Sequence, residues 1–145
     1  MSETEHTVVF KSNHRPKIVT LCGSTRFPHA YEVATLQWTI RGYVVLSAGA
    51  TVKKDTYLEA VTGGISPAQK EMLDELHLRK IDMSDEIVVL NVDGYVGDSV
   101  REEIIYALVE RKGINWLEPF VIDNFGKKIA THEFLVQLAN QEKIS

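Results

Sequence analysis

Short apolar runs rich in β-branched residues recur along this chain and are separated by segments of helical character. Three of these runs are Ile18–Leu21, Tyr43–Leu46 and Ile87–Leu90. Each is continuously apolar rather than alternating, which is typical of a strand buried on both faces of a parallel sheet. Parallel neighbours need long crossover connections, and these are usually helices. The runs therefore predict an α/β fold with right-handed crossovers.

The segments between these runs carry the start and stop signals of helices. Helices are predicted from Pro28 to a stop at Gly42, from Pro67 onward, from about Ser99 to Lys112, and roughly from Thr131 to Gln141. Proline suits a first turn because its missing N–H has no intrahelical partner there. A short strand near Trp116 and an apolar segment at Phe120–Ile122 precede the last helix. The order predicts a single-domain, doubly wound parallel sheet of the Rossmann or flavodoxin-like class, with helices on both faces.

The length of 145 residues fits one domain. Residues 1–16 are polar around one short apolar patch and are predicted to form an N-terminal arm, with the domain spanning residues 17–145. The stretch 47–66 is longer than most connections in compact domains, and such loops are usually functional. Asp55 and Tyr57 are its candidates for substrate contact.

Composition limits the partners and the compartment. The net charge is −4 without any basic run, which argues against binding to a nucleic-acid polymer. No apolar stretch approaches the roughly 20 residues that span a bilayer, so no membrane partner is expected. The N-terminus lacks the apolar region of a secretory signal, and the single cysteine, Cys22, cannot form an internal disulfide. These features predict a cytoplasmic protein. No cofactor is expected, and no set of residues has the spacing of metal ligands.

Two loops should meet at the binding edge of the sheet. In doubly wound sheets, ligands bind beyond the carboxyl ends of the strands, where the strand order reverses. If the first strand lies at that reversal, the loop Gly23–Phe27 faces the loop Asp93–Ser99. Gly23, Ser24, Thr25 and Arg26 offer backbone N–H groups, hydroxyls and a guanidinium, which suit an anion. An ordinary turn with a cap and a solvated arginine explains the same residues.

The second loop leads into a helix with one strongly apolar stripe. Ser99 and Glu102 have the spacing of a capping box. The predicted inward stripe consists of Val100, Ile104, Ala107, Leu108 and Arg111. Glu103 lies beside it in the predicted first turn, where an acid either complements the helix dipole or points at the strand ends. Tyr95, flanked by glycines, could lie against a planar ligand.

Two further side chains, His77 and Cys22, are of types that can take part in chemistry. In the helix that begins at Pro67, Met72, Leu73, Leu76 and Lys80 mark one face, which is largely apolar. His77 follows Leu76 at the edge of that face, where a surface or partner-satisfied histidine is more common than a catalytic one. Cys22 has no histidine near it in sequence and is interpreted as a buried, inert thiol.

Three motifs together resemble a known family. They are the segments 17–26 (KIVTLCGSTR), 84–91 (SDEIVVLN) and 97–107 (GDSVREEIIYA). Their order and spacing are similar to those of the nucleoside 2-deoxyribosyltransferase superfamily, which also contains nucleoside 5′-monophosphate N-glycosidases. The resemblance extends from about residue 17 to residue 117.

The resemblance implies a site and a reaction. Glu103 matches the nucleophile of the family and would form a glycosyl-enzyme from a small-molecule nucleoside or nucleotide. The residues matched to substrate or phosphate binding are Gly23, Ser24, Thr25, Arg26, Asp98 and Ser99, with His77, Tyr95 and Asn91 as accessory candidates. The family also implies a homodimer or higher homo-oligomer, in which a neighbouring subunit closes each site.

Two positions depart from the family pattern. Thr20 stands where members often have a tyrosine that holds the nucleophile, and His77 stands where they have an aspartate that contacts sugar or base. A histidine at that place could give a proton to the departing base.

Three functions are compatible with these residues. They are hydrolysis of a nucleoside 5′-monophosphate, base exchange between deoxynucleosides, and nucleotide binding without turnover. A flavodoxin-like electron carrier fits less well, because no aromatic pair that would frame a flavin is evident.

Overall fold

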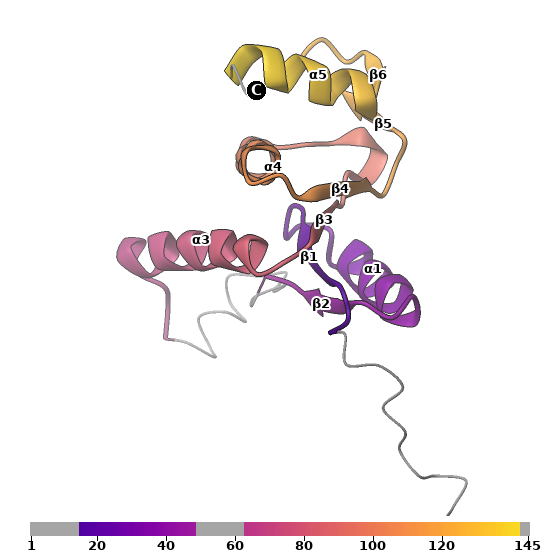
Figure 1. Ribbon diagram of the computed structural model, residues 1–145. Coiled ribbons are helices and arrows are strands. Elements are labelled where there is room, and N and C mark those ends of the chain that lie inside the picture. The colour runs from indigo at the N-terminus through magenta and orange to yellow at the C-terminus, as the bar shows by residue number, and fades with distance from the viewer. Residues whose placement is uncertain (1–14, 49–62, 143–145) are drawn as a thin grey trace, which may run out of the picture.

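The computed structural model describes residues 15–48 and 63–142. The elements in chain order are β1 (Ile18–Cys22), α1 (Pro28–Ile40), β2 (Val44–Leu46), α3 (Pro67–Asp82), β3 (Glu86–Val89), the 3-10 turn η2 (Val92–Gly94), α4 (Asp98–Val109), β4 (Gly113–Trp116), β5 (Phe120–Ile122), β6 (Lys128–Ala130) and α5 (Thr131–Glu142) (Figure 1). Most of the predicted arm lies outside the described residues. So does most of the loop 47–66, including Asp55 and Tyr57.

The main sheet is parallel and has the strand order β2-β1-β3-β4. Thr20 of β1 is in register with Leu46 of β2 on one side and with Ile87 of β3 on the other. The chain therefore moves outward from β1 to β2 and returns to form β3 on the opposite side. This confirms that the strand order reverses next to β1, and the arrangement is consistent with a Rossmann-like or flavodoxin-like fold.

Apolar side chains alternate between two clusters on the central strands, because successive strand residues point to opposite faces. One cluster consists of Val19, Leu21, Val88 and Leu90 with Tyr31, Ala34 and Trp38 from α1. The other joins Cys22, Ile87 and Val89 to Ile81 of α3 and to Val100, Ile104 and Ala107 of α4. The predicted inward stripe of α4 is thus confirmed for Val100, Ile104 and Ala107, and Leu108 is partly buried against the same cluster. Arg111 lies beyond the helix end, exposed and with a φ of 59°.

The apolar face of α3 is largely exposed. Met72, Leu73 and Leu76 are 54%, 42% and 46% exposed, whereas Ile81, in the last turn, is fully buried. Figure 1 shows the reason, since α3 extends well past the sheet and only its C-terminal part lies against other elements. Its first turn is held instead by a capping box, in which Ser66 accepts from the N–H of Gln69 and the Gln69 side chain accepts from the N–H of Ser66.

The predicted capping box of Ser99 and Glu102 is wrong. Helix α4 begins at Asp98, and its N-cap is the extended Gly97, which leaves no side-chain cap on the helix. The serine spacing alone does not distinguish an N-cap residue from one already inside the first turn. Because the helix starts at Asp98, Glu103 is its sixth residue and lies in the second turn rather than the first. The helix dipole therefore has little influence on it, since the effect fades beyond the first turn.

The C-terminal part adds an antiparallel hairpin of β5 and β6, of which the sequence analysis predicted only the apolar segment Phe120–Ile122. Phe120–Ile122 pairs with β6, which the apolar pattern did not reveal because β6 holds a single buried residue, Ile129. Asp123 orders the turn by accepting from the N–H groups of Phe125 and Lys127. The predicted last helix is confirmed as α5, which packs on α4 and the hairpin.

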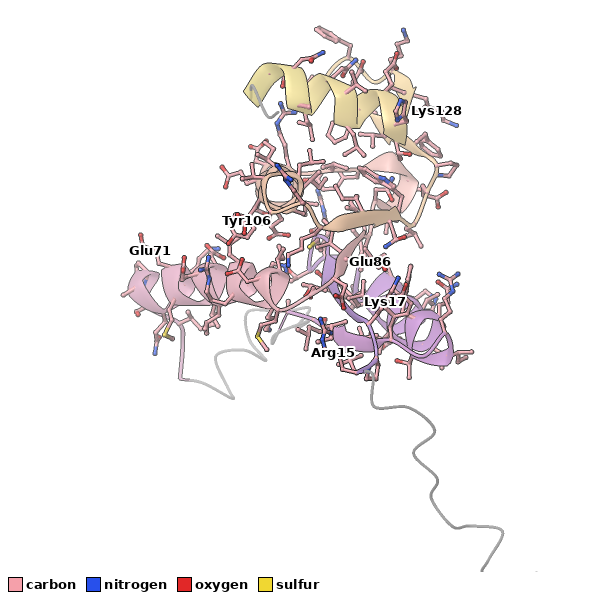
Figure 2. All side chains as sticks on the ribbon, in the orientation of Figure 1. Arg15, Lys17, Glu71, Glu86, Tyr106 and Lys128 are labelled. Carbon is pink, nitrogen blue, oxygen red and sulfur yellow. The ribbon has the colours of Figure 1, made fainter. Side chains whose placement is uncertain are left out.

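Charged pairs tie the strands together at the amino end of the sheet. Arg15 contacts Asp85 at 3.0 Å, and Lys17 lies 3.6 Å from Glu86 (Figure 2). The N–H of Ile18 also donates to Asp85 at 2.8 Å. These contacts leave the opposite, carboxyl end of the strands for a binding site. Among the described residues, no helix has the length and apolarity to cross a membrane.

Candidate functional site

A pocket of about 1060 Å³ opens at the carboxyl end of the sheet. Its walls come from the loop after β1, the loop before α4, one side of α3, and the residues that flank the undescribed segment 49–62. The two loops expected to meet do so here, since Gly23, Ser24 and Thr25 lie across from Gly97, Asp98 and Ser99. Gly23 lets the loop leave β1 next to β3, because a Cβ at this position would lie 2.8 Å from the Cβ of Leu90.

Glu103 extends from the second turn of α4 into this pocket. Its side chain is 20% exposed, and its Oε1 lies 3.4 Å from Nε2 of His77. Ile104, the next residue, is fully buried and fixes the rotation of the helix about its axis. This places a partly desolvated carboxylate with one imidazole contact at the base of the cavity.

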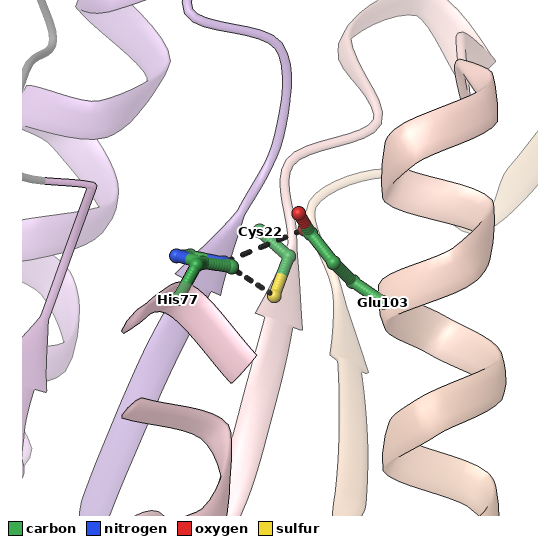
Figure 3. Close-up of side chains that lie close together, drawn as sticks. All are labelled: Cys22, His77 and Glu103. Atoms are coloured by element: carbon green, nitrogen blue, oxygen red, sulfur yellow. Dashed lines mark hydrogen bonds and ion pairs between the residues drawn. The ribbon is translucent and has the colours of Figure 1, made fainter. Parts of the chain in front are cut away.

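His77 is held at the point where α3 first reaches the body of the protein. Its side chain is 12% exposed, and its Nε2 faces both Glu103 and Cys22, whose Sγ is 3.6 Å away (Figure 3). The three side chains come from β1, α3 and α4. They are 26 or more residues apart in the sequence, so no local spacing could have indicated the cluster.

Cys22 is fully buried beneath this pair. Burial raises the pKa of the Cys22 thiol well above its usual value, and the negative charge and hydrogen bond of Glu103 raise it further. The thiol is thus held in its protonated form, in which it is a poor nucleophile. The buried position agrees with the sequence interpretation. The histidine contact is a feature that the sequence did not show.

Tyr31 of α1 is a pocket residue that the sequence reasoning did not single out. It is 4% exposed, lines the cavity, and donates a hydrogen bond from its hydroxyl to the carbonyl of Gly23 at 2.6 Å. Burial raises the pKa of Tyr31, with smaller contributions from the charges of Cys22 and Glu103. The apolar stripe of α1 had marked the residue as core. The sequence signal for Tyr31 is its place on a buried helical stripe next to the glycine loop. A buried tyrosine hydroxyl needs a hydrogen-bond partner, and this loop can supply one.

The two anion-binding candidates differ in how their backbone donors are used. In the first loop, the N–H of Arg26 donates to Ser24 Oγ and the N–H of Phe27 donates to the Ser24 carbonyl, so a local turn occupies both. At the start of α4, Asp98 and Ser99 line the pocket, and the N-cap residue Gly97 has no side chain with which to cap the helix. The first-turn N–H groups of α4 therefore lie at the pocket wall and carry partial positive charge.

Arg26 stacks on an aromatic ring beside the pocket. Its Cζ lies 4.1 Å from the ring centroid of Tyr95, and the ring of Phe27 makes an edge contact with Tyr95 at 6.1 Å. Tyr95 lines the cavity and is 41% exposed, whereas Arg26 is outside the set of lining residues. The guanidinium is thus placed next to the opening rather than within it.

Asn91 is placed away from the pocket. It is fully buried, and its side chain donates to the carbonyls of Glu118 and Phe120 and accepts from the N–H of Glu118. Its position holds the turn between β4 and β5, which is a structural task.

Two lysines of α3 line the pocket without having been expected there. Lys80 donates to the carbonyl of Ser47 at 2.6 Å, and Lys70 pairs with Asp74 at 3.8 Å. Both lysines belong to the α3 side of the pocket, where Asp74, the partner of Lys70, is also a lining residue.

The chain was compared with known proteins. No family model matches it, and a search of curated proteins returns no match.

Proposed function

We propose that this protein cleaves the N-glycosidic bond of a nucleoside 5′-monophosphate, with Glu103 as the nucleophile. The observation that carries the proposal is the position of Glu103. Its carboxylate lies in a large pocket that is also lined by the hydroxyl-bearing residues Ser24, Thr25 and Ser99 and by Asp98, the first residue of α4. A ligand that places a reactive carbon at Glu103 and a phosphate at these donors fits this set of residues.

The reaction would proceed in two displacements. The Glu103 carboxylate attacks C1′ of the sugar, the C1′–N bond breaks, and its electron pair leaves with the base, which takes up a proton. Water then attacks C1′ of the covalent intermediate and gives up a proton to solvent, and the bond between C1′ and the Glu103 oxygen breaks, which releases sugar 5-phosphate and regenerates the carboxylate. Both steps pass through oxocarbenium-like transition states, which a nearby carboxylate stabilises.

In this scheme His77 positions the nucleophile. Its Nε2 lies 3.4 Å from Glu103 Oε1, so a proton on Nε2 is directed at the carboxylate. This arrangement favours holding the carboxylate in place over donating to the departing base. The Tyr31 hydroxyl donates a hydrogen bond to the Gly23 carbonyl and so supports the loop that follows β1.

Base exchange between deoxynucleosides is the second candidate. The pocket of about 1060 Å³ is at the upper end of the range of typical small-molecule sites, which leaves space for an acceptor base beside the sugar. An acceptor base can outcompete water only if the pocket is dry during the second step.

The test is an assay for released base. Ribo- and deoxynucleosides would be incubated with and without a 5′-phosphate and with and without an acceptor base, followed by chromatographic separation. We expect release from the monophosphates alone, abolished in Glu103→Gln and retained in Glu102→Gln, the exposed neighbour on the same helix.

Other outcomes would redirect the proposal. Products that form only with an acceptor base would establish the transferase. Full activity in Glu103→Gln would end the nucleophile role, and no product from any substrate would favour a binding module.

The proposal includes a homodimer. Leu73 and Leu76 line the pocket and yet are 42% and 46% exposed, so they form an apolar rim on the protruding part of α3. A second copy that covers this rim would shield the pocket from water.

A further inference from the structure

The three side chains at the base of the pocket are all metal-binding types. Cys22 offers a sulfur, His77 an imidazole nitrogen and Glu103 a carboxylate oxygen, and the three atoms lie within 4.8 Å of one another. Figure 3 shows them converging from three elements on one point. This convergence goes beyond what the proposed glycosidase needs, because that reaction uses no thiol.

The distances match those around a tetrahedral metal ion. Bonds of about 2.3 Å to sulfur, about 2.0–2.1 Å to nitrogen and about 2.0–2.2 Å to oxygen place neighbouring donors roughly 3.3–3.6 Å apart. The observed separations are 3.6 Å from Cys22 Sγ to His77 Nε2 and 3.4 Å from His77 Nε2 to Glu103 Oε1. The third pair, the Cys22 sulfur and the Glu103 oxygen, lies within 4.8 Å, so an ion would have to draw these two donors closer together.

The surroundings also fit an ion. Cys22 is fully buried below the site, while His77 and Glu103 line the cavity, so a bound ion would have three protein ligands and one side open to the pocket. Thiolate, imidazole and carboxylate together suit Zn²⁺ better than Mg²⁺ or Ca²⁺, which prefer oxygen ligands alone.

We propose that Cys22, His77 and Glu103 bind one zinc ion per chain, with a fourth position open to the pocket. On binding, the sulfur–hydrogen bond of Cys22 is exchanged for a zinc–sulfur bond, and the proton leaves to solvent. If Glu103 is also the nucleophile of the proposed function, the same ion coordinates its carboxylate and thereby inhibits base release.

The first experiment is a titration of the metal-free protein with Co²⁺, which occupies zinc sites and absorbs visible light. Because the chain has a single cysteine, a thiolate-to-cobalt charge-transfer band can come only from Cys22. We expect this band together with tetrahedral d–d absorption, saturating at one equivalent and bleached by added Zn²⁺. Absence of the band, or its persistence in Cys22→Ser, would overturn the proposal.

Matched histidine variants test the second ligand. His77→Gln should weaken Co²⁺ binding by at least about ten-fold. His29→Gln should leave binding unchanged, since His29 pairs with Glu32 at 3.7 Å in a fully solvated position without a thiol. Equal losses in the two variants would contradict the assignment.

A measurement on the unaltered protein avoids dependence on the folding of Cys22→Ser. Zn²⁺ should raise its melting temperature, because a ligand that binds the folded state stabilises it. The rise should shrink in Glu103→Gln. An unchanged melting temperature in the unaltered protein would count against the site.

Failure of this site and failure of the proposed function give different results. A cobalt band without any base-releasing activity leaves the metal site standing and removes the glycosidase. Base release that is insensitive to Zn²⁺, with no cobalt band, removes the metal site and leaves the glycosidase.

Discussion

At the scale of single residues, the central feature is a histidine shared by a carboxylate and a thiol. His77 lies within 3.6 Å of both Cys22 and Glu103, and all three are at least four-fifths buried. Buried polar groups are costly unless they are paired, so each of these side chains depends on the others. This dependence is the reason why the site must be tested with conservative substitutions such as Glu103→Gln.

A residue-scale prediction concerns the glycine at the end of β1. In Gly23→Ala the new Cβ would meet Leu90 Cβ at 2.8 Å, inside the core, where neither neighbour can move freely. We expect a loss of about 1–3 kcal/mol in the free energy of unfolding, as is usual for overpacking. Urea denaturation would measure it. An unchanged midpoint would mean that the two strand ends are more adaptable than the contact implies.

A second residue-scale prediction concerns Asp85 and pH. The N–H of Ile18 and the guanidinium of Arg15 hold the pKa of Asp85 below its ordinary value. Because the pKa is lower in the folded than in the unfolded state, Asp85 stabilises the fold above its unfolded-state pKa. That contribution is lost as the pH falls through the folded-state pKa.

Asp85→Asn should therefore unfold more easily than the wild type at neutral pH, and the two should converge in acid. Thermal melts from about pH 7 down to about pH 2 would follow this convergence. A gap of constant size over that range would show that the carboxylate charge is not the cause.

At the scale of elements, the two pocket helices start in different ways. Helix α3 starts with the capping box of Ser66 and Gln69. Helix α4 follows Gly97, an N-cap residue without a side-chain hydrogen bond. The motif Ser-x-x-Glu/Gln occurs at both helices, yet it caps only one of them. The uncapped helix start is the one that lies at the pocket wall together with Asp98 and Ser99.

This difference predicts that a serine-to-alanine substitution has different effects at the two helices. Ser66→Ala should cost about 1 kcal/mol of stability, because an N-cap hydroxyl is lost. Ser99→Ala should leave the unfolding free energy nearly unchanged, and under the proposed function it should weaken the binding of nucleoside monophosphates. Urea denaturation and calorimetric titration would separate the two effects. A large loss of stability in Ser99→Ala would restore its assignment as a cap.

At the scale of the whole molecule, α3 contacts the other described elements mainly through its C-terminal part. It extends past the sheet, and its apolar residues Met72, Leu73 and Leu76 are about half exposed (Figure 1). An exposed apolar patch beside a binding pocket is characteristic of an interaction surface. The homodimer that we propose would cover it.

The dimer can be tested by charge substitution. Leu73→Glu should shift the mass in solution toward that of one chain, measured by light scattering after size exclusion. The control is Leu36→Glu on α1, an exposed leucine on a different helix, and its mass should stay that of the unaltered protein. A mass of one chain for the unaltered protein would remove the dimer from the proposal.

Much of the fold was predictable because it is encoded locally. The apolar runs at Ile18–Leu21 and Ile87–Leu90 became the central strands, and Pro28 and Pro67 became the first residues of helices. The meeting of the Gly23 and Gly97 loops followed from the strand order. The exposure of the apolar face of α3 was not predictable, since an apolar stripe does not reveal how far the sheet beneath it extends.

The sequence by itself therefore determined the alternation of strands and helices, the parallel sheet and the edge at which a site would form. These depend on backbone preference and on burial, which short segments express on their own. Only the tertiary structure decided that Cys22, His77 and Glu103 share one point and that Asn91 does not join them. Contacts between distant segments depend on helix orientation, and this is determined by the packing of the whole core rather than by any local spacing.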